Sequence, residues 1–142
     1  QQLELTDLTP STDFAQQLGR LSWPVDGKII VPYGQRRTNS RQRWSGTVLN
    51  PQADSAVHSV FAGRVVFSDW LRGFGLLLII DHGDGYLSLY GYNNSLRKAA
   101  GDWVEQTDVI ATTGSDEQGS GRFYFEIRQG GKPQDPTRWC RG

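Results

Sequence analysis

The sequence predicts a mainly β domain, built as an antiparallel β-sandwich or barrel. Three observations lead to this prediction. Short apolar segments recur along the chain, turn signals rich in glycine separate them, and no long amphipathic helix follows residue 20. The length of 142 residues fits one domain, and five Trp, five Tyr and six Phe supply a large area to bury in its core.

The first twenty residues differ from the rest. The stretch LTPSTDFAQQLGR offers Ser11 or Thr12 as a helix N-cap, then Phe14 and Leu18 at helical spacing, then Gly19 as a stop. A helix this short is marginal in water unless it packs on something. We therefore expect a linker or short helix over residues 1–20 and the domain proper over residues 21–142.

Eight later segments are predicted as strands, because each is short, apolar and bounded by turn signals. They cover residues 28–31, 46–49, 56–60, 63–68, 76–80, 86–92, 108–112 and 122–128. The stretches RGFG, HGDG, YNNS and GSDEQGSG mark turns between them. Asp81 and Asp84 flank the first glycine of the HGDG turn, and they are expected to make backbone hydrogen bonds rather than to act as acids or bases.

The last predicted strand has two unlike faces, since side chains alternate along a strand. One face is an ordinary core face and carries Phe123, Phe125 and Ile127. The other face carries Arg122, Tyr124, Glu126 and Arg128. A solvated face rarely places an aromatic ring among two arginines and a glutamate, so this face is a candidate functional surface.

The charges of the chain balance, with 15 Lys+Arg and 15 Asp+Glu. A neutral chain has no global field that would collect nucleic acid or anionic membrane. The dense basic run GQRRTNSRQRW over residues 34–44 is either a contact for an anion or acidic partner, or a solvated loop between strands. It has few aromatic residues for stacking, so we expect no nucleic acid partner.

Targeting signals are not visible in the sequence. No apolar run approaches the ~18 residues of a membrane span. The chain begins at Gln1 and contains no Met, which indicates a mature or excised fragment.

The candidates for chemistry are few. The chain has two histidines and one cysteine, whereas a zinc site normally needs three or four His, Cys, Asp or Glu ligands. His58 lies in a predicted strand and His82 in a predicted turn, and we interpret both as structural. Cys140, two residues from the end, is interpreted as a plain terminal thiol. These residues favour a binding domain.

The order of the segments nevertheless resembles a known family. The stretches AGRVVFSDWLRGFGLLLIIDHGDGYLSLYGYN, AGDWVEQTDVIATTGS and GRFYFEIRQGGKPQDPTRW follow one another as in the lysostaphin/LytM-type metallopeptidase domain, and the resemblance covers residues 21–139. It implies an antiparallel β-sandwich with a groove. In active members of the family a zinc ion polarises a water that cuts peptide cross-links in peptidoglycan.

This sequence departs from the family pattern at the active site. The family's three zinc ligands match Trp44, Val48 and Tyr124, and its two catalytic histidines match Tyr92 and Arg122. Trp, Val and neutral Tyr do not provide a ligand set for zinc. We therefore predict a degenerate domain with no cofactor and no metal-dependent peptidase activity.

The replacement residues suggest a new use of the groove. Aromatic and aliphatic side chains in a concave floor make a dry anchor site for another protein, and arginines make a charged rim. The alternative is that the aromatic residues merely fill the space of a lost active site. The predicted groove residues are Trp44, Ser45, Val48, Phe74, Tyr92, Arg122, Tyr124 and Arg128.

Within the family, the sequence is most similar to degenerate members that activate cell-wall amidases, on LSWPV, RW-x-G-x-V, DWL-x-G-x-G, SLYGYN and YFEIR. That resemblance implies a periplasmic protein of the Gram-negative division septum. It also implies an N-acetylmuramoyl-L-alanine amidase as partner, and the FtsEX complex as a partner of an upstream coiled coil that this chain lacks.

Two further hypotheses concern the same groove. It could instead bind peptidoglycan stem peptides without catalysis, with arginines facing their carboxylates. Residues 1–20 could also cover it in a resting state, because Leu3, Leu5, Leu8, Phe14 and Leu18 need burial somewhere.

Overall fold

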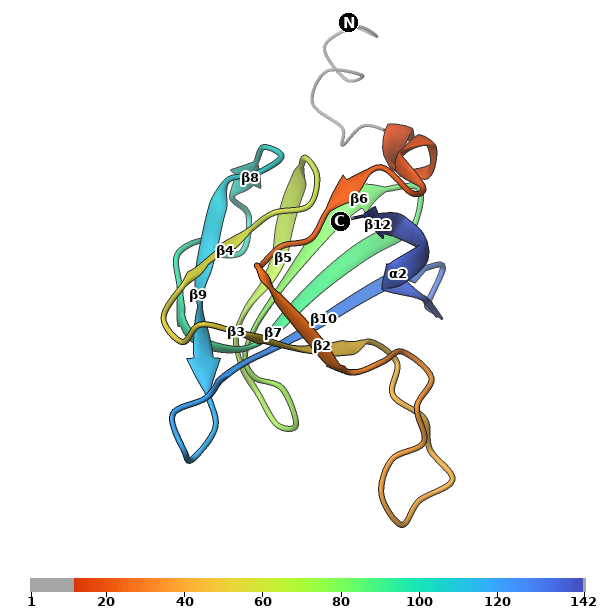
Figure 1. The fold of residues 1–142 in the computed structure, drawn as a ribbon. Helices are drawn as coiled ribbons and strands as arrows, with labels where there is room; N and C mark the ends of the chain where they lie inside the picture. Colours follow the sequence, from red (N-terminus) through yellow and green to blue (C-terminus); the bar gives the residue numbers. More distant parts are fainter. Residues whose placement is uncertain (1–11, 142) are drawn as a thin grey trace, which may run out of the picture.

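The computed structural model describes residues 12–141. It is mainly β, as predicted, with one short 3-10 helix, η1 (Thr12–Gln17), and one short α-helix, α2 (Pro136–Trp139). The strands, shown in Figure 1, are β1 (Leu21–Ser22), β2 (Gly27–Val31), β3 (Thr47–Pro51), β4 (Ala56–His58), β5 (Gly63–Leu71), β6 (Gly75–Gly83), β7 (Tyr86–Leu96), β8 (Trp103–Val104), β9 (Val109–Ser115), β10 (Gly121–Gln129), β11 (Lys132–Gln134) and β12 (Cys140–Arg141). All eight predicted strands are present. None of the helices in the described residues is long and apolar enough to cross a membrane.

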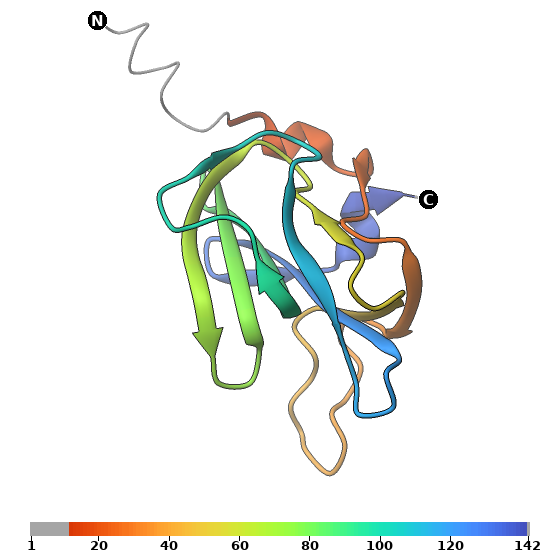
Figure 2. The same ribbon diagram turned by 90° about the vertical axis from the view of Figure 1, so that its left-hand side faces the viewer.

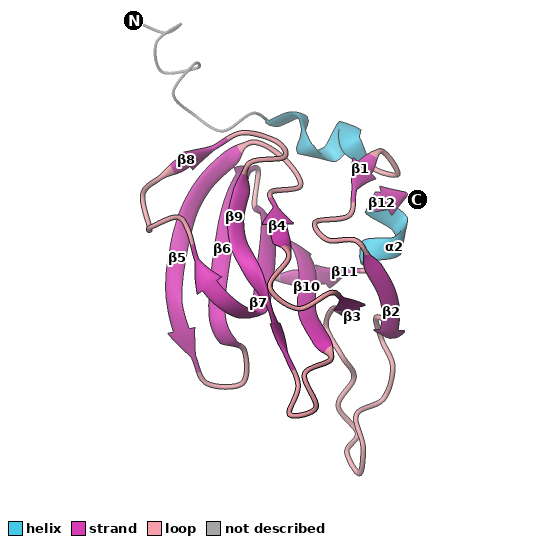
Figure 3. Cartoon of the chain, turned by 60° about the vertical axis from the view of Figure 1, so that its left-hand side comes forward, coloured by secondary structure: helices cyan, strands magenta, loops and turns pink. Residues whose placement is uncertain are grey.

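Within the described residues, ten strands form one antiparallel sheet in the order β2-β3-β10-β9-β7-β6-β5-β8, with β11 on β10 and β4 on β9. Strand β10 is the hub, because it pairs with β3, β7, β9 and β11. The sheet curves strongly, and β4 and β9 lie in front of β7 and β10 in Figure 3. The short strands β1 and β12 form a separate pair that is parallel, an exception to the predicted antiparallel arrangement.

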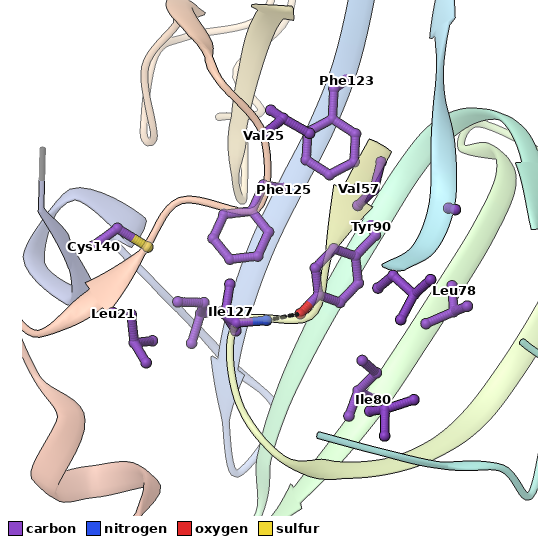
Figure 4. Close-up of a cluster of buried hydrophobic side chains, with 14 of the residues drawn as sticks. Leu21, Val25, Val57, Leu78, Ile80, Tyr90, Phe123, Phe125, Ile127 and Cys140 are labelled. Carbon is purple, nitrogen blue, oxygen red and sulfur yellow. Dashed lines mark hydrogen bonds between the residues drawn. The ribbon is translucent and has the colours of Figure 1, made fainter. Parts of the chain in front are cut away.

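The core fills the space inside this curved sheet. Phe123, Phe125 and Ile127 of β10 are fully buried, which confirms the predicted core face. They pack with Tyr90 of β7 and Val57 of β4, among others (Figure 4). The Tyr90 hydroxyl accepts a hydrogen bond from the Val60 backbone N–H at 3.1 Å, so this buried polar atom has a partner.

His82 is a core residue rather than the turn residue that the sequence suggests. Strand β6 extends through Gly83, and the turn is formed by Asp84 and Gly85, with φ of 54° and 80°. The Nδ1–H of His82 donates to the Ala62 carbonyl at 2.8 Å, and Nε2 lies 2.6 Å from the Ser88 hydroxyl. Burial lowers the pKa of His82 to about 4, so the ring is neutral at pH 7.

The predicted YNNS turn is also wrong, because these residues belong to β7. Asn93 is 7% exposed, and its Nδ2 donates to the carbonyls of Leu76 and Tyr90. The Asn93 side chain therefore makes the kind of hydrogen bond to backbone that favours Asn in turns, but it makes it inside the sheet. The preceding Tyr92 has φ of 61°, which leaves an irregularity in the strand instead of a reversal of the chain.

The N-terminal helix packs on the domain. Phe14 is fully buried, and its ring stacks on His82 at a centroid distance of 4.6 Å and contacts Trp139 at 4.9 Å. Leu18, predicted to share the apolar face, is 47% exposed. Gly19 ends the segment with φ of 78°, as expected of a stop. The hypothesis that this segment covers the groove fails for Phe14, while Leu3, Leu5 and Leu8 lie outside the described residues.

Candidate functional site

Tyr124 lies at the centre of the candidate site. It sits on β10 between β3 and β7, with Val48 and Gly91 as its direct neighbours across the two pairings. Because side chains alternate along the strand, its ring points away from the core face that carries Phe123 and Phe125. The residue is nevertheless only 3% exposed, so other groups cover most of the ring.

Three aromatic residues from separate parts of the chain surround this ring. The centroids of Phe74, Tyr92 and Trp44 lie 5.6, 5.7 and 6.1 Å from that of Tyr124, all in tilted orientations. Phe74 comes from the β5–β6 turn, and its carbonyl accepts the backbone N–H of Tyr92 at 2.8 Å. Tilted ring pairs at these distances are favourable beyond their buried area.

Two glycines make room for the Tyr124 ring. A Cβ atom on Gly46 would lie 2.9 Å from both Cζ and Oη of Tyr124 and would overlap the Phe125 carbonyl oxygen. A Cβ on Gly91 would come within 3.4 Å of the Tyr124 Cβ and Cδ2. The ring therefore occupies a slot that larger residues at positions 46 and 91 would narrow or close.

Glu126 links the ring to the charged edge of the site. It is fully buried on the same face of β10; its Oε1 accepts the Tyr124 hydroxyl at 2.6 Å, and its Oε2 pairs with the Arg128 Nε. Burial, followed by the nearby Glu126 carboxylate, raises the pKa of the Tyr124 hydroxyl far above its usual range. Tyr124 therefore stays protonated and acts as a hydrogen-bond donor.

A hollow of about 310 Å³ opens beside these side chains. Six of the predicted residues line it: Trp44, Ser45, Phe74, Tyr92, Tyr124 and Arg128. Its other lining residues are Arg37, Gln42, Gly73 and Glu126. The Arg37 guanidinium lies 3.8 Å from the Trp44 ring centre, a cation–π contact at the rim.

Two predicted residues lie beside this hollow rather than on its walls. Val48 is 1% exposed and supports Tyr124 as its neighbour on β3. The Arg122 guanidinium lies 4.3 Å from the Tyr92 ring centre, and the residue lines a different hollow with Asn50 and Asp116. Arg37 and Gln42 had not been predicted. Their only signal in the sequence was a basic run that ends directly at Trp44.

A larger hollow, of about 960 Å³, lies beside Trp23 and His58. Trp23 packs on Phe125, at a centroid distance of 6.1 Å, and so this hollow lies on the side of β10 opposite Tyr124. It contains none of the residues that match the family's catalytic positions. We therefore place the candidate site at the smaller hollow.

The residues present do not fit the zinc ion that the family pattern implies. Trp44 stacks with Arg37, Val48 is a buried aliphatic side chain, and the Tyr124 hydroxyl donates to Glu126. The nearby Glu126 carboxylate is occupied by Tyr124 and Arg128. Among residues 12–141, no group of three or more His, Cys, Asp or Glu side chains lies where it could hold a metal ion. The site instead offers a floor of aromatic rings, with a buried carboxylate held by Tyr124 and Arg128, and a basic rim.

The model of peptidase family M23 matches residues 42–136, and the chain belongs to this family. The antimicrobial peptidase lysostaphin from Staphylococcus simulans has the same fold, with a TM-score of 0.69 at 19% identity over 81% of this chain and 50% of that one.

Two curated relatives have names that describe a role. The chain is 38% identical over 122 residues to the murein hydrolase activator EnvC of Escherichia coli, covering 85% of this chain and 29% of that protein. It is 35% identical over 130 residues to the murein hydrolase activator NlpD of Salmonella dublin, covering 91% of this chain and 33% of that protein. The chain thus spans a third or less of the length of these relatives.

Proposed function

We propose that this domain is a non-catalytic activator of periplasmic N-acetylmuramoyl-L-alanine amidases. It binds the amidase through the groove around Tyr124, and binding relieves autoinhibition while septal peptidoglycan is split. The names of the relatives EnvC and NlpD support an activator role. In this proposal, attachment to the FtsEX complex at the septum is the task of a coiled coil outside this chain.

One observation carries the proposal. At positions that match metal ligands and catalytic histidines in the family stands a packed cluster of Trp44, Tyr92 and Tyr124, and Phe74 joins it. Simple filling of a lost active site would close the hollow, yet about 310 Å³ stays open beside these rings. The packed aromatic rings of the floor suit the apolar face of a partner helix.

Activation then follows as a shift of population. In the resting amidase, a segment of its own chain covers the active site. The groove offers that segment a competing binding site. The population of the open amidase then rises by an amount set by the difference in the groove's affinity for the open and closed states. The domain needs no chemistry of its own for this function.

The direct test is release of dye from labelled peptidoglycan by a purified amidase, with and without this domain. Wild-type domain should stimulate release, and Tyr124→Ala should lose on the order of 1–3 kcal/mol of amidase binding, as buried anchors do. Trp103→Ala is a matched control, because Trp103 is 51% exposed on β8 and is not part of the groove lining. Full stimulation by folded Tyr124→Ala domain would contradict the groove assignment.

A second candidate function is binding of peptidoglycan itself. It is favoured by Arg37 and Arg128, which both line the hollow and can face the carboxylates of stem peptides. Cosedimentation with purified sacculi separates the two functions. If Tyr124→Ala loses sacculus binding but keeps full amidase stimulation, the groove serves peptidoglycan.

A further inference from the structure

One segment of this neutral chain, which includes the groove residue Trp44, carries only basic charges. Residues 27–53 contain Lys28, Arg36, Arg37, Arg41 and Arg43, and not a single Asp or Glu. The chain as a whole carries equal numbers of both signs. The compensating carboxylates therefore lie in other segments, and the charge of the chain is unevenly distributed.

The four arginines belong to an ordered hairpin rather than to a loose loop. This arginine hairpin, residues 34–44, projects away from the body of the domain (Figure 2). The backbone N–H of Gly34 donates to the Trp44 carbonyl and that of Trp44 to the Gln35 carbonyl, both at 2.9 Å. Arg36 and Arg43 form an isolated antiparallel bridge further out, and Asn39 has φ of 56° at the tip.

Within the described residues, no carboxylate pairs with the guanidinium groups of the hairpin. All four arginines are exposed, and three of them bond to backbone or ring instead. Arg36 Nε donates to the Ser40 carbonyl at 2.8 Å, Arg43 donates to the Gly34 carbonyl at 2.9 Å, and Arg37 stacks on Trp44. Within residues 12–141 there is one salt bridge between side chains, and it joins Arg128 to Glu126, which both lie outside the hairpin. Four like charges on one short hairpin repel each other, and a bound anion would relieve this repulsion.

The position of the hairpin indicates what that anion belongs to. Arg37, Gln42 and Trp44 form one wall of the hollow, so a segment seated against Tyr124 lies within the field of the hairpin. The tip residues Thr38, Asn39 and Ser40 are polar, which is unsuited to insertion into a bilayer. Arg37 covers a face of the Trp44 ring, so base stacking there is obstructed.

We infer that the arginine hairpin recognises an acidic protein segment, namely the part of the partner hydrolase that enters the groove. This inference rests on the proposed function and adds the charge of the partner. The segment presents an apolar face to Tyr124 and carboxylates to the hairpin. The long-range field of the hairpin steers the acidic segment toward the groove and raises the rate of encounter.

The test measures association and dissociation rates of purified amidase with the domain at low and high salt. The variant Arg36→Glu/Arg41→Glu reverses two hairpin charges that do not line the hollow. The control Arg20→Glu/Arg97→Glu changes the net charge equally at two exposed positions outside the hairpin. For the hairpin variant we expect association at least roughly ten times slower at low salt, a flatter salt dependence, and a dissociation rate within about threefold of wild type.

The possible outcomes separate the two ideas. Equal association rates for the hairpin and control variants, with wild-type domain still stimulating the amidase, overturn the acidic-segment inference alone. A wild-type domain that neither binds nor stimulates any amidase of its organism overturns the proposed function and the inference with it. A third outcome is that wild-type domain binds phosphatidylglycerol vesicles or sacculi, that only the hairpin variant loses this binding, and that amidase association is unchanged. That result overturns the acidic-segment inference and assigns the hairpin to those anions instead.

Discussion

Glu126 is the residue whose replacement tests most directly how the site is held. Its carboxylate is buried and serves two partners on the docking face, the hydroxyl of Tyr124 at 2.6 Å and the guanidinium of Arg128. The substitution Glu126→Gln keeps the shape of the side chain and removes its charge. The amide oxygen can still accept from Tyr124, but it no longer pairs with Arg128 as an ion.

The magnitude follows from these contacts. Hydrogen bonds to a charged group contribute about 1.5–3 kcal/mol, and neutral bonds contribute about half as much. The side chain of Arg128 is 34% exposed, so water replaces part of the interaction it loses. We therefore expect Glu126→Gln to lower the free energy of unfolding by about 1–2 kcal/mol.

Urea unfolding at pH 7 measures this change, and a double-mutant cycle with Tyr124→Phe isolates what the charge of Glu126 adds to its bond with Tyr124. We expect a coupling of about 1 kcal/mol between Tyr124→Phe and Glu126→Gln. The control cycle pairs Tyr124→Phe with Ser68→Ala, since Ser68 bonds to the Lys98 carbonyl on another strand. If the changes in unfolding free energy of Tyr124→Phe and Glu126→Gln are additive, as those of the control pair should be, the charge of Glu126 does not strengthen its bond to the ring.

Two further predictions concern the opposite side of the fold. Because burial lowers the folded pKa of His82 to about 4 from 6.5, the unfolded chain takes up this proton first as pH falls. The free energy of unfolding should thus fall by about 2 kcal/mol between pH 7.5 and pH 5. If the His82→Gln variant loses the same amount of stability, the loss comes from other groups. Phe14→Ala should cost about 3–5 kcal/mol of unfolding free energy, because the buried ring packs on His82 and Trp139. Calorimetry measures the effect of Phe14→Ala, and Leu18→Ala, at an exposed position nearby, is its control. Equal melting temperatures for the two variants would show that η1 does not stabilise the domain.

Strands could be predicted where local pattern decides them. The alternation of Phe123, Phe125 and Ile127 is visible in the sequence, and all three residues are buried in the core. Glycine turns delimit β5, β6 and β7 for the same local reason. The opposite face of β10 could also be predicted, since Tyr124 and Arg128 line the hollow together with Trp44.

Features set by distant partners could not be predicted. The strands β1 and β12 have two residues each and exist because segments almost 120 positions apart pair with each other (Leu21 with Cys140). The rings on which Phe14 packs come from residues at least forty positions away, which no local periodicity encodes. Val48 faces Tyr124 across a strand pair, but only the packing around it decides that it is covered rather than open to the hollow.

Replacement of a metal site by rings changes what keeps the groove in shape. The polar groups left in the floor satisfy each other, since Glu126 accepts from Tyr124 and pairs with Arg128. In the described part of the chain, one buried side-chain polar atom has no hydrogen-bond partner, Oδ1 of Asn93. This residue does not line the groove. Gly46 and Gly91 leave just the space that the Tyr124 ring needs. The groove is therefore organised before any partner arrives, and a partner segment that binds to it does not have to supply the ordering free energy of the floor.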